Sequence, residues 1–310
     1  LKFSLMPARC ESFRFFGNSK ETIMIISGFT IIRNAVMNDY PILEAIRSIL
    51  PLVDEMIVLV GDSSDETLAL IESIKDDKIK IHHSVWDTAQ SKGGSILAVE
   101  TNKALQYVSP ESDWLFYIQG DEVIHEKYHD AILHGCEKYK TDKTVEGLLF
   151  KYLHFYGTYD YVGDSRTWYA HEVRIIRNDK NIKAYRDAQG FRKGNEKLHV
   201  KPIDAYVYHY GWVKSPEQMQ QKRKNVAGFW NIEDIMEKEP DFFDFTQFDS
   251  LEKFKGTHPE VMQERIKNKN FHIELDIQKK KFFFKDKILY WFEKMTGIRL
   301  FDFKNYRILK

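Results

Sequence analysis

The stretch EMIVLVGDSSDETLALIESIK, residues 55 to 75, decides the fold class of this chain. Its first part, EMIVLVG, is a near-continuous apolar run, which is typical of a strand buried in a parallel sheet. The polar loop DSSDET follows, and Ser64 or Asp65 could cap the helix predicted for ETLALIESIK. Strand, polar loop and helix in this order are the repeating unit of an open parallel sheet.

The same unit recurs on both sides of this stretch. Upstream, the β-branched run TIMIISGFTIIRN precedes DYPILEAIRSILPLV, where Ile42, Ala45, Ile46 and Ile49 stand at helical spacing. Downstream, KIKIHHSVW, SILAVETNKALQYV and DWLFYI predict a strand, a helix and a further buried strand. The alternation predicts an α/β fold, a Rossmann-like mostly parallel sheet with helices on both faces.

The sequence pattern changes after residue 145. Aromatic, β-prone segments such as VEGLLFKYLHFYGTYDYVG and DAYVYHYGWV are not separated by long helices, so we expect them to add strands to the sheet and wall a cleft. Three regions are predicted: a poorly ordered extension over residues 1–23, one α/β domain over 24–230, and a C-terminal helical extension over 231–310, rich in basic and aromatic residues.

Composition narrows the class of protein. Lys+Arg and Asp+Glu both number 46, and this balance argues against a globally basic nucleic-acid-binding protein. Cys10 and Cys136 are the two cysteines, too few for a disulfide framework or a zinc ribbon, which suits a reducing compartment. No apolar run approaches the roughly 20 residues that cross a bilayer. We therefore expect a cytoplasmic location.

Residues 125 to 129, HEKYH, match the zinc-protease pattern H-E-x-x-H. A zinc metallohydrolase would use His125 and His129 as ligands and Glu126 as the base. The match falls in the first turns of a helix directly after a strand, and the longer continuation H-x-x-G-x-x-H fails because Ile132 and Gly135 occupy the needed positions. We expect the two histidines to be polar residues on a helix surface, with the zinc enzyme as the alternative.

The loop QGDEV, residues 119 to 123, stands at the end of the predicted strand DWLFYI. Ligands of open α/β sheets lie beyond the carboxyl ends of the strands, so the Asp121 carboxylate is expected to face the cleft. There it could bind Mg²⁺ or Mn²⁺, or instead cap the following helix. Neither G-x-G-x-x-G nor a P-loop motif occurs, which disfavours a dinucleotide-binding fold and a P-loop enzyme.

The ordered set GFTIIRN, VLVGDSSDET, TNKAL and DWLFYIQGDEV resembles the family 2 glycosyltransferases of the GT-A fold, of the kind that builds bacterial surface glycans such as lipopolysaccharide. The resemblance covers residues 24–230, which would then be the catalytic domain. It implies transfer of a hexose-like sugar from a nucleotide sugar, most often a UDP-sugar, to a hydroxyl of a glycan or lipid-linked acceptor.

The resemblance also implies where a nucleotide sugar would bind. The family's leading Asp of the second loop falls at Val60 here, so Asp62 would have to substitute for it. Lys92, in the loop SKGG, could reach a phosphate. The positions matched to the family's nucleotide-binding elements are Thr30, Arg33, Asn34, Ser63, Ser64, Asp65 and Thr67. Asp62, Lys92, Gln119 and Gly120 are further candidates for binding the nucleotide sugar, with a solvated side chain as the alternative for Lys92.

A metal site follows from the same resemblance. Asp121 matches the last Asp of the family's D-x-D element, while its first Asp is replaced by Gln119, a weaker metal ligand. His209 in VYHYGWV is a candidate second ligand for Mn²⁺ or Mg²⁺, with a hydrogen-bonded core histidine as the alternative. Tyr210 and Trp212 are candidates for stacking against a sugar ring, or for the core.

Family members invert the anomeric centre and use a carboxylate to deprotonate the acceptor. Asp187, after the predicted strand IKAYR, is our first candidate for this base, Glu172 is the second, and Asp164 in VGDSRTW is a further one. The alternatives to a glycosyltransferase are the zinc hydrolase and a non-catalytic protein that binds nucleotide sugars. The basic, aromatic C-terminal tail is expected either to pack on the domain or to contact the cytoplasmic face of a membrane.

Overall fold

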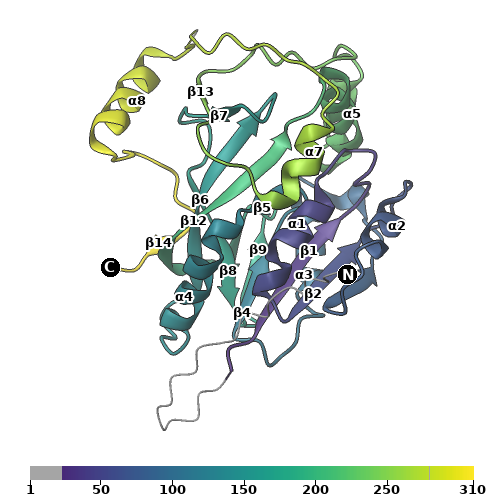
Figure 1. The fold of residues 1–310 in the computed structure, drawn as a ribbon, viewed down its shortest axis with the longest axis vertical. Helices are drawn as coiled ribbons and strands as arrows, with labels where there is room; N and C mark the ends of the chain where they lie inside the picture. The colour runs from purple at the N-terminus through teal and green to yellow at the C-terminus, as the bar shows by residue number, and fades with distance from the viewer. Residues whose placement is uncertain (1–22, 279) are drawn as a thin grey trace, which may run out of the picture.

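Four parallel strands form one half of the central sheet (Figure 1). Their spatial order is β3-β2-β1-β4, and the bounds are β1 (Ile26–Ile32), β2 (Glu55–Val60), β3 (Ile79–His83) and β4 (Trp114–Tyr117). All residues of β1, β2 and β4 are buried, as their apolar sequences predict. The computed structural model describes residues 23–278 and 280–310, so the extension expected over residues 1–23 lies almost wholly outside the described residues.

Helices cover both faces of this half of the sheet. Because side chains alternate along a strand, Ile26 and Ile32 of β1 point to one face, and Phe29 and Ile31 point to the other. The first face packs against α1 (Ile42–Ile49), α2 (Thr67–Glu72) and α4 (His129–Tyr139), and the second against α3 (Ser95–Ala104). The α/β fold with helices on both faces, predicted from the sequence, is confirmed.

The second half of the sheet is largely antiparallel. β8 (His171–Arg177) pairs antiparallel with β4 and with β6 (Gly147–Tyr156). The long strand β12 (His199–Trp212) runs parallel to β6 and antiparallel to β5 (Glu122–Ile124). β7 (Tyr161–Gly163) also belongs to this half of the sheet. A separate small sheet consists of β9 (Ile182–Tyr185), β10 (Gly190–Lys193) and β11 (Glu196–Lys197).

The C-terminal part of the chain combines short helices with irregular segments and two short strands. Its helices are α5 (Pro216–Val226), α6 (Glu233–Met236), α7 (Gln263–Lys267) and α8 (Phe284–Thr296). Two short strands join the sheet, β13 (Leu251–Lys253) beside β7 and β14 (Arg307–Ile308) beside β12. They supply backbone hydrogen-bond partners to strand edges that would otherwise be open. Within the described part of the chain, no helix combines the length and apolarity that a membrane span requires.

A buried ion pair joins β8 to β5, at the border between the two halves of the sheet. Arg174 of β8 and Glu122 of β5 both have fully buried side chains, and two guanidinium nitrogens of Arg174 lie 2.7 and 2.8 Å from the Glu122 carboxylate oxygens. The Tyr152 hydroxyl donates to the same carboxylate at 2.7 Å, as does the Gln119 backbone N–H at 3.2 Å. Glu122 therefore fixes the loop between β4 and β5, which carries Asp121.

We expect Arg174→Met to lower the free energy of unfolding by about 3–5 kcal/mol, because it leaves the Glu122 charge buried without a partner. The double variant Glu122→Gln/Arg174→Met should recover part of this loss. Urea unfolding measures both. As a control, Lys151→Met removes an exposed partner of Asp204 and should change stability little. An Arg174→Met protein as stable as this control would contradict the assignment.

Candidate functional site

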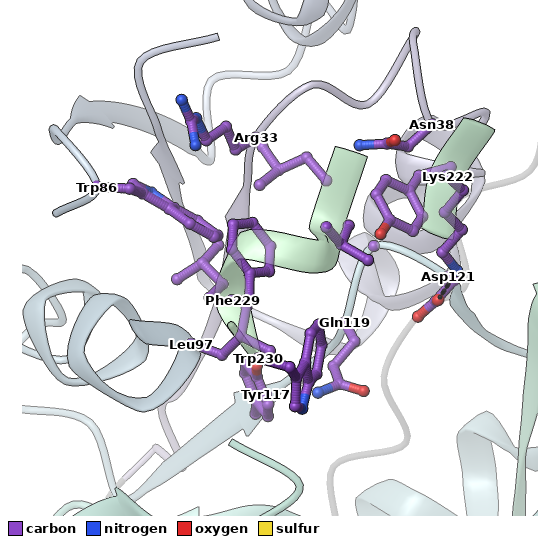
Figure 2. A pocket seen from close by; sticks show the side chains of 15 residues that line it. Arg33, Asn38, Trp86, Leu97, Tyr117, Gln119, Asp121, Lys222, Phe229 and Trp230 are labelled. Atoms are coloured by element: carbon purple, nitrogen blue, oxygen red, sulfur yellow. Dashed lines mark hydrogen bonds and ion pairs between the residues drawn. The ribbon is translucent and has the colours of Figure 1, made fainter. Parts of the chain in front are cut away.

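A cavity of about 220 Å³ lies at the carboxyl ends of β1 and β4. This edge of a parallel sheet is where open α/β proteins bind ligands. Figure 2 shows Arg33 and Trp86 at one end of the cavity, Asp121 and Lys222 at the other, and Phe229 between them. The lining residues are Ile31, Ile32, Arg33, Asn38, Tyr40, Trp86, Leu97, Tyr117, Gln119, Gly120, Asp121, Lys222, Val226, Phe229 and Trp230.

The Arg33 end of the cavity is organised by Asp62. The Asp62 carboxylate lies 3.2 Å from the Arg33 guanidinium and accepts the Trp86 backbone N–H at 3.1 Å. Asp62 therefore holds together three loops, one after each of β1, β2 and β3. The structure brings Asp62 to the edge of the site that the sequence predicted, and Trp86, which the sequence analysis missed, forms the wall.

Several predicted nucleotide-binding residues instead tie the loops to one another. The Asn34 side-chain oxygen accepts the Ser64 backbone N–H at 2.8 Å, and Asp65 accepts the N–H groups of Met37 and Thr67. Thr30 is fully buried within β1 and does not line the cavity. These residues shape the loops, whereas Arg33, Gln119 and Gly120 line the cavity itself.

Asp121 lies next to an imidazole and an ammonium group. β12 pairs with β5 so that His209 lies opposite Glu122, which brings the His209 Nε2 atom to 3.6 Å from Asp121 Oδ2. The Lys222 ammonium of α5 lies 3.3 Å from the same oxygen and also donates to the Gly211 carbonyl at 3.0 Å. The structure thus brings the two predicted metal ligands together and adds Lys222.

The charges of this cluster stabilise one another. Burial alone would raise the pKa of the Asp121 carboxyl, but the neighbouring His209 and Lys222 side chains lower it well below its usual range. Burial would lower the pKa of the Lys222 ammonium, yet Tyr40 and Asp121 raise it above its ordinary value. Near neutral pH the cavity therefore ends in an ionised carboxylate in contact with an ammonium group.

No motif or spacing in the sequence indicates that Lys222 belongs to the site. It belongs to the run KRKN, where Lys224, two residues further on, pairs with the exposed Asp241 at 3.0 Å. Phe229 and Trp230 follow α5, and Phe229 is positioned through its carbonyl, which accepts hydrogen bonds from Ser91 and Gly94. The exposed Lys92 lies in this supporting loop and does not line the cavity.

The aromatic residues predicted to stack on a sugar do not line the cavity. Tyr210 is 2% exposed, and its hydroxyl lies 2.8 Å from His258 Nδ1. Trp212 packs in an aromatic cluster with Tyr156 and Phe243. Alternation along β12 explains this outcome, because residues 210 and 212 point away from the face that carries His209. Trp86, Phe229 and Trp230 provide the aromatic surface instead.

The two candidate bases occupy different places. Asp187 lies in the turn between β9 and β10, flanked by Arg186 and Ala188 at positive φ angles of 56° and 58°. The Gln119 side chain reaches the Ala188 carbonyl at 3.5 Å, so this turn borders the cavity. Glu172 is buried on β8, and its Oε2 atom has no hydrogen-bond partner among the described residues.

Glu172 faces a second cavity, of about 560 Å³, that lies between the sheet and α8. Gln189 lines both this cavity and the depression that contains Asp187. Burial, opposed by the Arg174 charge and reinforced by Glu122, raises the pKa of Glu172 to about 8. Near neutral pH, Glu172 is therefore mostly a neutral acid.

The HEKYH segment forms no metal centre. His125 is buried rather than on a helix surface, which corrects the sequence prediction, because its ring caps a short 3₁₀ turn and lies 2.8 Å from the Thr257 hydroxyl. His129 Nε2 lies 3.0 Å from the Ser48 carbonyl. The described residues contain no group of three His, Cys, Asp or Glu side chains that could hold a metal ion.

A smaller donor set fits a divalent ion that a substrate helps to bind. Asp121 and His209 offer one carboxylate oxygen and one imidazole nitrogen within 3.6 Å of each other. Mg²⁺ is commonly held by one or two carboxylates, with substrate phosphates and waters completing the shell. His154 supports His209 through their Nδ1 atoms, 3.1 Å apart, and burial lowers the pKa of His154 to about 3.

Comparisons with known proteins return distant structural likenesses. No protein-family model and no curated protein sequence matches the chain. The structure of TarS from S. aureus in complex with UDP aligns over 66% of this chain and 64% of that chain, at 17% identity and a TM-score of 0.37. The 4-diphosphocytidyl-2C-methyl-D-erythritol synthase from Anaerococcus prevotii aligns over 66% of this chain and 96% of that chain, at 12% identity and a TM-score of 0.35.

Glucosyl-3-phosphoglycerate synthase from Mycobacterium tuberculosis, in complex with Mn²⁺ and UDP-glucose, aligns over 43% of this chain and 44% of that chain. Its identity is 21% and its TM-score 0.28. In a longer TarS structure, the aligned part spans 39% of that chain. At these values the likenesses establish no activity for this chain, and its α/β class rests on its own strands and helices.

The raised pKa of Glu172 predicts a pH-dependent stability difference. The folded state holds a proton on Glu172 between its ordinary pKa of 4.5 and about 8, so this residue destabilises the fold as pH rises through that window. The stability advantage of Glu172→Gln over the wild type should grow across the window, to on the order of a few kcal/mol, and level off above pH 8. Urea unfolding at several pH values measures this difference.

The exposed Glu111 provides a matched control. Glu111→Gln should follow the wild-type pH dependence throughout. If the free energies of unfolding of Glu172→Gln and of the wild type changed in the same way from pH 4.5 to 8, the raised pKa of Glu172 would be wrong.

Proposed function

We propose that this protein is a glycosyltransferase that moves a sugar from a nucleotide-sugar donor to a hydroxyl group of an acceptor. The observation that carries the proposal is the cavity between Trp86 and Asp121, which has an aromatic and cationic wall at one end and a carboxylate–lysine pair at the other. A nucleoside diphosphate sugar has the matching parts, a flat base and a charged diphosphate.

The base fits the end formed by Arg33, Trp86 and Phe229. Aromatic rings and guanidinium planes stack on any nucleobase, because every base has a flat π-face. Asp62 holds Arg33 and the Trp86 backbone in place for such stacking. The diphosphate would then lie toward Lys222, whose ammonium can neutralise charge that develops on the leaving group. A UDP-sugar is the donor that we propose.

Asp121 and His209 would hold Mn²⁺ or Mg²⁺ together with the donor. When bound, the ion supplies Lewis-acid stabilisation of the departing diphosphate. Lys222 contacts the same Asp121 oxygen, so it keeps the carboxylate ionised before the donor arrives and adds a second positive charge beside the phosphates. Gln119, in place of a second carboxylate, orients the turn that carries Asp187 through the Ala188 carbonyl.

Asp187 is the proposed base for the acceptor hydroxyl, in a single displacement that inverts the anomeric centre. It lies one residue from the contact between Gln119 and Ala188, at the border of the donor cavity. Glu172 is the second candidate, although it is mostly protonated near neutral pH and lines the cavity under α8. A surface glycan or lipid-linked saccharide, made on the cytoplasmic side of a membrane, is the acceptor we propose.

Donor binding tests the proposal. UDP-sugars with Mn²⁺ should raise the melting temperature of the protein, and Trp86→Ala should weaken their binding about tenfold or more because a stacking surface is lost. Trp291→Ala is the matched control, since Trp291 lies exposed on α8, outside the cavity. Lys222→Met should also weaken binding, whereas Lys224→Met should not. If no nucleotide or nucleotide sugar stabilises the wild type, the proposal fails.

Catalysis separates a transferase from a protein that only binds nucleotide sugars. Asp187→Asn should lower the rate of donor turnover by roughly 10²–10⁴-fold, the usual contribution of a general base, with donor affinity unchanged. Turnover is measured as release of the nucleoside diphosphate. A larger loss in Glu172→Gln than in Asp187→Asn would transfer the role of base to Glu172. A wild type that binds the donor without turnover, with or without glycan acceptors, would support the non-catalytic alternative.

A further inference from the structure

Helix α8 lies at the periphery of the molecule (Figure 1), and its partly buried side mixes polar residues with Leu289 and Phe292. Glu293 pairs with Arg166 at 2.7 Å, and the Tyr290 hydroxyl donates to Asp164 at 2.6 Å. Asp286 and Leu289 line the cavity between α8 and the sheet. None of the helix residues is buried. The helix is therefore attached through ion pairs, hydrogen bonds and a small apolar contact, in which the Tyr290 ring packs against Phe282.

The opposite side of α8 is apolar and exposed. Phe284, Ile288, Trp291 and Met295 stand at positions i, i+4, i+7 and i+11, which places them on one face of the helix. Their exposed fractions are 81%, 54%, 66% and 65%. This arrangement differs from that of an ordinary surface helix, whose solvent-facing side is polar. Large exposed side chains continue the surface on either side of the helix, at Phe283, Ile298, Phe301 and Phe303.

The exposed charges of the chain segment that contains α8 are of one sign. Between residues 280 and 310, every charged residue that is exposed is a lysine or arginine, namely Lys280, Lys281, Lys285, Lys287, Lys294, Lys304, Arg307 and Lys310. Lys280, Lys294 and Arg307 make ion pairs with acidic residues elsewhere in the chain, whereas the other five make no ion pair with any described residue. The three acidic residues of this segment are partly buried, and two of them, Glu293 and Asp302, pair with arginines. An exposed apolar stripe with basic side chains beside it is the pattern of a helix that lies in the interface of an anionic membrane.

We propose that α8 docks the protein on an anionic lipid surface. Phe284, Ile288, Trp291 and Met295 enter the boundary between headgroups and acyl chains, and the exposed lysines contact the lipid phosphates. The ion pairs of the inner face keep the helix anchored to the protein while it is docked. This inference does not depend on the proposed transferase activity, although it would place the cavity beneath α8 close to lipid-linked molecules.

Sedimentation with vesicles tests the proposal on the full chain. The wild type should bind vesicles of phosphatidylcholine and phosphatidylglycerol, bind pure phosphatidylcholine much more weakly, and be released by salt. Ile288→Gln/Trp291→Gln should lower binding to the anionic vesicles at least tenfold. Lys285→Gln/Lys287→Gln should lower it by roughly fivefold for each lysine removed.

Matched controls carry the same kinds of change elsewhere on the surface. Val85→Gln/Ile235→Gln removes two exposed apolar side chains away from α8, and Lys75→Gln/Lys138→Gln removes two exposed lysines. Both controls should bind like the wild type, and all variants should keep its melting temperature, because the altered side chains are exposed.

Three outcomes would overturn the proposal. The first is a wild type that does not bind anionic vesicles, and the second is an α8 variant that binds them as tightly as the controls. The third is a concentration-dependent dimer, seen by sedimentation velocity, that Ile288→Gln/Trp291→Gln dissociates while vesicle binding stays unchanged. That result would assign the apolar stripe to a second copy of the chain.

Discussion

The ion pair between Arg174 and Glu122 is the constraint on which the site depends. Both charges are removed from water, so each is tolerated only because the other is present. The pair lies where the parallel half of the sheet meets the antiparallel half, and the Gln119 N–H completes the coordination of the Glu122 carboxylate. The loop that ends β4 is thereby tied to the ion pair, and Asp121 within it lines the cavity.

The contact of Asp121 with His209 and Lys222 also depends on how the two halves of the sheet meet. β5 leaves the loop and pairs with β12, and that pairing carries His209 to the Asp121 carboxylate. α5 follows β12 directly in the chain and returns Lys222 to the same oxygen. A carboxylate, an imidazole and an ammonium group from three separate segments are thus assembled at one end of a cavity whose other end is aromatic. Such a site suits a ligand that is flat at one end and anionic at the other.

Much of the fold followed from the sequence, because buried parallel strands are continuous apolar runs and amphipathic helices repeat every 3.6 residues. The site was only partly predictable. Asp121 could be placed because it follows a buried strand, and His209 through a family resemblance. Lys222, Trp86 and Phe229 could not be placed, since their role comes from chain segments that return to the cavity from a distance. Tyr210 was assigned to the site although the alternation of β12 turns it into the core.

The sequence by itself determined the α/β class, the order of strands and helices, and the loops at whose ends polar residues gather. These are local properties, set by side-chain periodicity and by turn chemistry along a short segment. Tertiary structure alone decided which polar residues face the cavity, the charge state of Asp121 and Glu172, and the outward orientation of the apolar face of α8. Each of these depends on how the elements pack against one another and on charges contributed by residues far away in the chain, and a local sequence pattern encodes neither.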